Sequence, residues 1–260
     1  MLSTLLKKIH GHLVGQHDFP TLFGEASVYS IPDEEDRPVR VLAVDGVLQS
    51  ATYLDERWAL CPFEYLRSFD HIFEADETHP IEHVLMIGGA GFAYPKQLLT
   101  QHPGVKLDVV EIDEAMVNIA HEFFFLDRLE ALLAEQSRAD DLRIFVEDGE
   151  EFLQECTNSY DAIIIDAFAG REDVGYFRTD DGIAAAKRLL SPGGLLMFNC
   201  VIEYTGDDMY RLYHFVESLH AHFAQVSVID ASDEQFGGAE NYLVVATDGT
   251  YPFTNVIPYD

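Results

Sequence analysis

Short apolar runs alternate with amphipathic stretches over most of the chain. Between His83 and Val201, apolar runs of strand length are separated by segments in which apolar residues recur at helical spacing. Runs that are apolar throughout are typical of parallel strands covered by helices on both faces of the sheet. The strands predicted here are Val84 to Ile87, Val105 to Glu111, Leu142 to Val146, Ala162 to Asp166 and Leu195 to Val201.

The segments between these strands are predicted to be helices. The helix over Thr179 to Leu190 places Ile183, Ala186 and Leu190 inward, and Pro192-Gly193-Gly194 is predicted to end it in a turn. The other helices are expected at Tyr94 to His102, Ala115 to Phe124, a stretch before Asp140, Glu150 to Cys156 and Met209 to Phe223.

The last two apolar runs, Val226 to Asp230 and Tyr242 to Thr247, have no helix between them. Only the loop around Gly237-Gly238 separates them, so they are expected to pair antiparallel. A parallel sheet closed by an antiparallel hairpin is typical of the Rossmann-like, class I methyltransferase-type fold and not of the dehydrogenase sheet. We therefore expect an α/β domain of this type over residues 77–260.

The first part of the chain has a different pattern, and we expect residues 1–76 to form a small β-rich domain with a linking helix. Asp45-Gly46 is a hairpin turn signal. Pro62 is expected to open a helix whose buried face carries Phe63, Leu66, Phe69, Ile72 and Phe73. The strands expected in this domain are Ala26 to Ile31, Val39 to Val44 and Val47 to Tyr53.

Composition narrows the class of function. The net charge of −30, from 46 acidic and 16 basic residues, repels nucleic acid and anionic lipid and attracts cations such as polyamines. A solvated acidic surface explains the same charge without a ligand, and we favour that explanation. No apolar run is long enough to span a membrane and no signal peptide is recognised, so a cytoplasmic location is expected.

Cysteine and histidine spacing predicts neither disulfides nor a metal site. Cys61, Cys156 and Cys200 are far apart and lack paired spacing, so buried free thiols are expected. His220 and His222 lie two residues apart on a predicted helix and therefore point to different faces.

A glycine-rich turn follows the first parallel strand. Gly88, Gly89 and Gly91 would let the backbone turn sharply and approach a ligand closely, although a tight turn without a ligand is the simpler alternative. Glu111 ends the next strand, about 20 residues later, where a carboxylate can accept hydrogen bonds from both ribose hydroxyls. Together the two features predict a nucleoside cofactor site.

Two further strand ends add acidic residues at the same edge. Asp148 is placed to accept from an adenine amino group and the Gly149 amide to reach a ring nitrogen, while Asp148 can also cap the helix that follows. Asp166 ends the fourth parallel strand, with Ala167 after it, and faces the same crevice. Both residues are expected to bind the cofactor. Asp166 is the candidate catalytic residue on the acceptor side.

Taken together, these motifs resemble the spermidine synthase (polyamine aminopropyltransferase) superfamily over nearly the whole chain. The resemblance implies that Glu111 binds the ribose, that Asp148 and Gly149 bind the adenine, and that Gln49 reaches toward the sulfur. Ile112, next to Glu111, is also expected to bind the cofactor. It also implies S-adenosylmethionine or its decarboxylated form as cofactor, methylthioadenosine as product, and a homo-oligomer such as a dimer. The motifs are Val44-Asp45-Gly46-Val47-Leu48-Gln49, the Gly88 loop, Val110-Glu111-Ile112-Asp113, Asp148-Gly149-Glu150-Glu151-Phe152-Leu153 and Tyr160 to Asp166.

Three positions depart from the pattern of working aminopropyltransferases. Gly91 and Ala169 stand where that pattern has aspartates, and Pro62 stands where it has a tyrosine. The form Gly-Gly-Ala-Gly-Phe-Ala-Tyr-Pro is similar to a divergent, spermidine-synthase-like bacterial branch. Two carboxylates that would hold cationic groups are thus absent.

We expect aminopropyl transfer to a small amine, with a polyamine as the acceptor class that the resemblance implies. Methyl transfer from S-adenosylmethionine to an unknown small acceptor is the first alternative, because a methyl group needs no ammonium anchor. A non-catalytic nucleoside-binding protein is the second. Residues after the fourth strand are candidates for acceptor specificity, namely Arg171, Glu172, Asp173, Tyr176 and Phe177.

Overall fold

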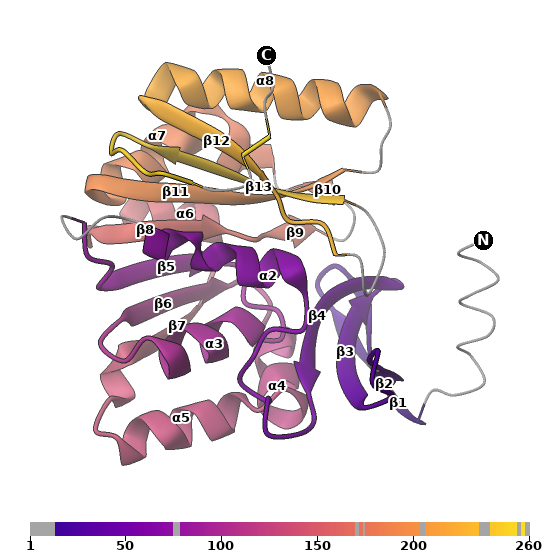
Figure 1. The fold of residues 1–260 in the computed structure, drawn as a ribbon. Helices are drawn as coiled ribbons and strands as arrows, with labels where there is room; N and C mark the ends of the chain where they lie inside the picture. Colours follow the sequence, from indigo (N-terminus) through magenta and orange to yellow (C-terminus); the bar gives the residue numbers. More distant parts are fainter. Residues whose placement is uncertain are drawn as a thin grey trace.

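The described residues form a seven-stranded sheet, a smaller four-stranded sheet and a short two-stranded ribbon, with helices packed around the seven-stranded sheet (Figure 1). A computed structural model describes residues 14–74, 79–169, 172–173, 175–202, 206–233, 240–253 and 256–257. The expected domain boundary at residue 76 lies outside the described residues. No helix in the described part of the chain has both the length and the apolar character that crossing a membrane requires.

The larger sheet has seven strands in the order β12-β13-β11-β8-β5-β6-β7. Strands β7, β6, β5, β8 and β11 are parallel, whereas β13 pairs antiparallel with both β11 and β12. This confirms the class I methyltransferase-type fold and the antiparallel closing hairpin. The strands are β5 (His83–Ile87), β6 (Lys106–Glu111), β7 (Leu142–Val146), β8 (Tyr160–Ile165), β11 (Leu190–Ile202), β12 (Gln225–Asp230) and β13 (Glu240–Thr247).

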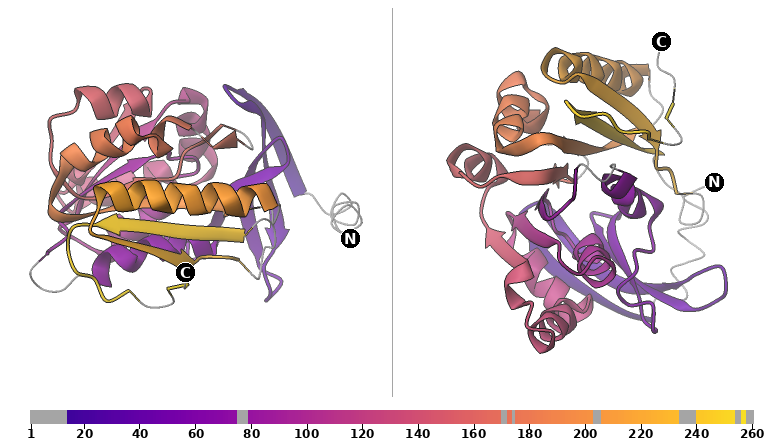
Figure 2. Two further views of the ribbon diagram at one scale, coloured as in Figure 1. Left: turned by 90° about the horizontal axis from the view of Figure 1, so that it is seen from above. Right: turned by 60° about the vertical axis from the view of Figure 1, so that its left-hand side comes forward.

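Helices cover both faces of this sheet because alternate residues of each buried strand point to opposite sides. Val84 and Met86 of β5 pack on the side of α3, α4 and α5, and Leu85 and Ile87 pack on the side of α6, α7 and α8. Figure 2 shows α8 lying alongside β12 and β13. The helices are α3 (Ala93–Gln101), α4 (Glu114–Phe123), α5 (Leu126–Glu135), α6 (Gly149–Glu155), α7 (Asp180–Leu189) and α8 (Gly206–His222).

One predicted boundary was wrong. Pro192-Gly193-Gly194 was expected to form a turn that ends a helix, but α7 ends at Leu189 and β11 already begins at Leu190. The pairing of β11 with β8 shifts register between Leu190 and Leu195. The proline and glycines therefore sit in a strand irregularity, where a missing ladder hydrogen bond is tolerated.

The smaller sheet is antiparallel throughout, in the order β1-β2-β3-β4. Asp45 and Gly46 join the last two strands with φ values of 48° and 81°, as a two-residue hairpin of the predicted type requires. The first strand was not predicted, because it is a largely exposed edge strand without an apolar alternation. The strands are β1 (Val14–Thr21), β2 (Gly24–Pro32), β3 (Pro38–Val44) and β4 (Val47–Tyr53).

The small sheet packs directly on α4. Its apolar face, formed by Ala26, Val28, Leu42 and Val44, shares a buried cluster with α4 and with Phe124. Asp113 adds a polar connection between the two parts, because its Oδ2 accepts from the Leu22 amide at 2.7 Å and its Oδ1 accepts from the Ala115 amide at 2.9 Å. The small sheet is thereby held close to the helix that follows β6.

The segment after β4 continues across the large sheet. The single helix expected from Pro62 is a short α-helix, α2 (Glu64–Ser68), followed by a 3-10 helix, η1 (Phe69–Glu74). Phe63, Leu66 and Phe69 are buried as expected. The remaining short elements are η2 (Ala139–Asp141), β9 (Phe168–Ala169), β10 (Glu172–Asp173) and η3 (Gly175–Arg178).

Candidate active site

The glycine loop joins the ends of β5, β6 and β8. Gly88 has a φ of +96°, and its amide donates to the Val110 carbonyl at 2.9 Å. A Cβ atom on Gly88 would lie 2.3 Å from the carbonyl oxygen of Asp166. Gly88 is therefore needed both for its backbone conformation and for the close approach of β8.

Glu111 binds the loop from the end of β6. Its Oε2 accepts from the Gly89 amide at 2.9 Å and from the Ala90 amide at 3.0 Å, and its Oε1 accepts from the Asp113 amide at 3.0 Å. The side chain is 7% exposed, and burial raises the pKa of the carboxyl while the three amides oppose that rise. A carboxylate has about four acceptor positions, so one remains for a ligand hydroxyl.

The loop continues into α3 through two residues in the left-handed region. Ala90 has a φ of 43° and Phe92 has a φ of 52°, a backbone conformation that residues other than glycine rarely adopt. The Phe92 ring is fully buried, and its Cε2 would lie 2.8 Å from a Cβ on Gly89. Buried packing thus holds a strained loop in place, as is common at ligand sites.

Asp166 follows β8 directly and lies beside the loop. Its amide donates to the Ile87 carbonyl at 2.9 Å, and its Oδ1 accepts from the Asn199 side chain at 2.8 Å. Burial raises the pKa of Asp166 to about 7, the Asn199 hydrogen bond opposes this, and the Glu111 charge adds to it. A carboxyl with such a pKa can take up or release a proton near neutral pH.

Two residues of this region were missed in the sequence. Asn199 is 7% exposed in the middle of β11. A polar residue within an otherwise apolar strand was the sequence signal that could have identified it. Tyr65 of α2 donates its hydroxyl to the Gln49 carbonyl at 2.9 Å. Burial raises the pKa of Tyr65, and the charge of Asp166 adds to that rise.

The predicted adenine residues, Asp148 and Gly149, follow the end of β7. Asp148 caps α6, because its Oδ1 accepts from the Glu150 amide at 2.7 Å, which confirms the capping alternative. A Cβ on Gly149 would lie 2.6 Å from Cγ2 of Ile87, so α6 begins in close contact with β5. Ile112 is 38% exposed beside Glu111 and leaves an apolar surface at this edge.

Comparison with known proteins identifies the family. Residues 63–229 match the family model of the spermine/spermidine synthase domain. The polyamine aminopropyltransferase of Shigella dysenteriae is 30% identical over 217 residues, which cover 80% of this chain and 67% of that enzyme. The chain belongs to the spermine/spermidine synthase family. The family predicted from the motifs is thus confirmed.

Other members differ in the extent of the match. The polyamine aminopropyltransferase of Chromobacterium violaceum is 28% identical over 138 residues, which cover 53% of this chain. The match spans about half the length of that enzyme, namely 48%.

Solved structures agree with the fold. A probable spermidine synthase from Corynebacterium glutamicum superposes with a TM-score of 0.73 at 20% identity, covering 92% of this chain and 82% of that one. Human methyltransferase-like protein 13, solved in complex with SAH, gives a TM-score of 0.56 at 18% identity, covering 75% and 85%. The large sheet is thus shared with both kinds of protein.

The three positions that depart from the pattern expected of the spermidine synthase family all lie among the described residues. Gly91 is in the loop itself, and Ala169 is in β9, which pairs antiparallel with β10. Pro62 lies three residues before Tyr65, the residue whose hydroxyl bonds to the Gln49 carbonyl. The Gln49 side chain contacts the Val47 carbonyl at 3.5 Å.

The candidate specificity residues after β8 differ in location and burial. Arg171 lies outside the described residues, and Glu172 and Asp173 form the backbone of β10. Phe177 is buried, with its ring 3.0 Å from the position of a Cβ on Gly149. Tyr176 is half-buried, and its hydroxyl accepts from the Gln154 side chain at 3.4 Å.

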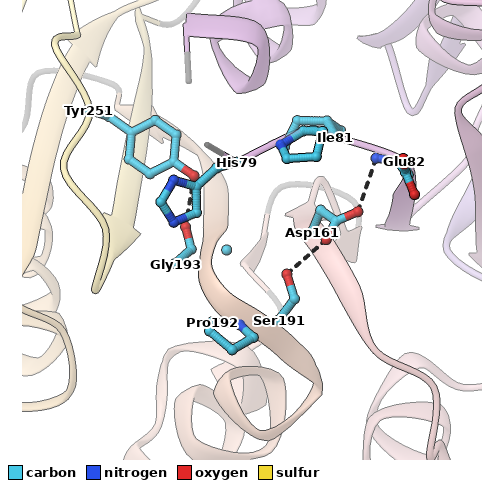
Figure 3. Close-up of a pocket in the computed structure, with 10 residues that line it drawn as sticks. His79, Ile81, Glu82, Asp161, Ser191, Pro192, Gly193 and Tyr251 are labelled. Carbon is cyan, nitrogen blue, oxygen red and sulfur yellow. Dashed lines mark hydrogen bonds between the residues drawn. The ribbon is translucent and has the colours of Figure 1, made fainter. Parts of the chain in front are cut away.

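A separate cavity of about 150 Å³ lies at the opposite, amino-terminal edge of the large sheet (Figure 3). Asp161 closes it by accepting from the amides of Glu82 and His83 and from the Ser191 hydroxyl, at 2.9, 3.0 and 2.8 Å. Both Asp161 oxygens are therefore occupied by bonds that join β5, β8 and β11. Among the described residues no group of three or more potential metal ligands is found.

Proposed function

We propose that this protein transfers an aminopropyl group from decarboxylated S-adenosylmethionine to a small amine. The observation that carries the proposal is the meeting of the Gly88 loop, Glu111 and Asp166 at one strand edge in a member of this family. Gly88, Gly89, Gly91, Glu111 and Ile112 would hold the ribose and the chain leading to sulfur. Asp148, Gly149 and Ala167 would surround the adenine.

The transfer would depend on positioning and on one carboxylate. The amine nitrogen attacks the carbon of the aminopropyl group that is bonded to sulfur. The N–C bond forms as this C–S bond breaks, and the electron pair of the broken bond stays on sulfur in methylthioadenosine. The nitrogen must lose a proton, and Asp166 would receive it, since its pKa is raised to about 7. Asn199 would keep the Asp166 carboxylate oriented.

A polyamine is the acceptor class we favour. The relatives from Shigella and Chromobacterium are named polyamine aminopropyltransferases, and the net charge of −30 attracts cations. Methyl transfer remains the second candidate, because Gly91 and Ala169 supply no carboxylate to a cationic donor group.

Calorimetry with methylthioadenosine and S-adenosylmethionine tests the nucleoside site. Glu111→Gln keeps the size of the side chain but turns an NH₂ group toward amide donors, so we expect affinity to fall by about tenfold or more. Glu147→Gln, at an exposed residue directly after β7, is the matched control and is expected to bind like the wild type. Equal binding by wild type and Glu111→Gln would contradict the assignment.

Product analysis separates the three functions. With decarboxylated S-adenosylmethionine and putrescine, we expect methylthioadenosine and an aminopropylated amine. S-adenosylhomocysteine formed from S-adenosylmethionine would instead indicate methyl transfer. Nucleoside binding without turnover across a panel of amines would support the non-catalytic alternative.

A further inference from the structure

The space beside Gly91 is filled by a residue of the small sheet. A Cβ atom on Gly91 would lie 2.6 Å from Oγ and 2.8 Å from Cβ of Ser50 in β4. The φ of Gly91 is outside the left-handed region, so its backbone conformation is open to other residues. Glycine is therefore required at position 91 by the lack of space and not by the backbone.

Side-chain rotation cannot open this space. The Ser50 hydroxyl could turn away, but its Cβ is fixed to the β4 backbone and would still lie 2.8 Å from the new atom. Phe124 closes another side, with Cδ1 at 3.1 Å from the same position. Ser50 is 2% exposed, so it lies within a packed interface that resists extra volume.

The segments around this space are tied together by Lys96. Its Nζ donates to Thr52 Oγ1 at 2.8 Å and to the Phe124 carbonyl at 2.8 Å. Thr52 is two residues after Ser50 in β4, so both side chains point to the same face of the strand. Glu111 holds the other partner, the loop, through the amides of Gly89 and Ala90.

We propose that Ser50 is a specificity-determining residue of the donor site. By excluding any side chain from position 91, it denies the sulfur substituent of the donor a charged partner on the loop. The proposal rests on the proposed function, since it takes the loop to bind an S-adenosyl-type donor. The wild type should then bind methylthioadenosine and decarboxylated S-adenosylmethionine with affinities within about threefold of each other.

Thermal unfolding of ligand-free protein tests the exclusion itself. We expect Gly91→Ala to lower the Tm by about 5 °C, because the added methyl group overpacks the contact with Ser50. The same substitution in a Ser50→Gly background should cost little. Ser50→Ala is the matched control, because it removes the hydroxyl but keeps the Cβ, and it should not relieve the loss.

The exclusion is wrong if Gly91→Ala lowers the Tm equally in the Ser50 and Ser50→Gly backgrounds. This measurement needs no ligand. It therefore judges the contact between Ser50 and position 91 even if the chain binds no nucleoside.

Calorimetry tests the effect on donor choice. In the variant S50G/G91D, decarboxylated S-adenosylmethionine should bind at least about tenfold more tightly than in S50G, because an aspartate then meets its ammonium group. Methylthioadenosine, which lacks that ammonium, should bind equally to both variants. G91D alone should bind neither ligand well, since Ser50 displaces the loop.

Three results would overturn the donor part of the proposal. The first is that G91D alone gains as much affinity for decarboxylated S-adenosylmethionine as S50G/G91D does. The second is that S50G/G91D binds methylthioadenosine but gains no affinity for the decarboxylated donor. The third is that the wild type already binds the decarboxylated donor more than about tenfold more tightly than methylthioadenosine. A wild type that binds no nucleoside at all would instead overturn the proposed function and the donor role together.

Discussion

Glu111 and Asp166 are two carboxylates at one strand edge with different surroundings. Glu111 accepts three backbone amides, whereas Asp166 accepts one side-chain amide from Asn199. Hydrogen bonds favour the ionised form and burial disfavours it, so the residue with fewer donors has less to offset the cost of burial. Glu111 is suited to hold the loop and the nucleoside, and Asp166 is suited to exchange a proton.

The pH dependence of transfer should reflect Asp166. Its pKa is raised to about 7, so the carboxylate that receives the proton becomes populated as pH rises through that value. We expect kcat/KM to increase from pH 6 to pH 8 and expect Asp166→Asn to lower it by about a hundredfold or more. A pH–rate profile of the wild type checks the first part. An unchanged profile with full activity in Asp166→Asn would contradict the assignment.

Asp166 should also make the free energy of unfolding depend on pH, and this free energy should fall as pH rises. Because its pKa is raised above the unfolded value of about 4, the folded protein binds more protons than the unfolded chain between pH 4 and 7. Stability contributed at this site is full at low pH and is lost as pH rises toward 7. Measured by denaturant unfolding, the free energy of unfolding of the wild type should fall between pH 5 and pH 7 by about 1–2 kcal/mol more than that of Asp166→Asn.

At the scale of elements, several predicted site residues lie at the first turns of helices or directly before them. α6 begins at Gly149 directly after its cap Asp148, and α4 begins after its cap Asp113. The Asp148 carboxylate has one oxygen on the Glu150 amide, and the proposed adenine contact would use the other. The capping role and the proposed ligand role therefore fall on one side chain, and a variant is needed that separates them.

Asp148→Ser provides that separation. Serine is a good helix cap, so we expect the free energy of unfolding to stay within about 0.5 kcal/mol of the wild type. Methylthioadenosine affinity should fall by about tenfold, because the shorter hydroxyl does not reach the adenine amino group. Asp148→Ala should lose affinity and also about 1 kcal/mol of stability. Unchanged affinity in Asp148→Ser would leave only the capping role.

At the scale of the whole molecule, Lys96 joins the small sheet to the part of the chain that carries the seven-stranded sheet. Its ammonium is fully buried and donates to Thr52 of β4 and to the carbonyl of Phe124. No salt bridge to it is found among the described residues, and burial lowers the pKa of Lys96 to about 7. Cys61, whose thiol pKa is raised by burial, is the titratable group that acts on it.

Lys96 should therefore make stability depend on alkaline pH. With a pKa below the unfolded value of about 10.4, the folded protein binds fewer protons than the unfolded chain between pH 7 and 10. Stability should rise with pH in that window, by about 1–2 kcal/mol between pH 7 and pH 9 relative to Lys96→Met. Denaturant unfolding of both proteins checks this. Parallel pH dependences in the two proteins would show that Lys96 does not ionise there.

Residues close in sequence made much of this protein predictable. The parallel strands follow from apolar runs, the turn at Asp45-Gly46 from its residue types, and the cap at Asp148 from its position before a helix. β1 was missed because an exposed edge strand needs no apolar alternation. The start of β11 was misplaced because Pro192 and the glycines after it indicate a turn and a strand irregularity equally well.

The sequence by itself determined the sheet, the Gly88 loop and the placement of Glu111, Asp148 and Asp166 at strand ends, because each depends on short-range spacing. Tertiary structure alone decided which residues those groups meet. The contact of Gly91 with Ser50, the bond of Asn199 to Asp166 and the two bonds of Lys96 join residues that are distant along the chain. Such contacts depend on how the small sheet and the helices pack, and no local pattern of residues records that packing.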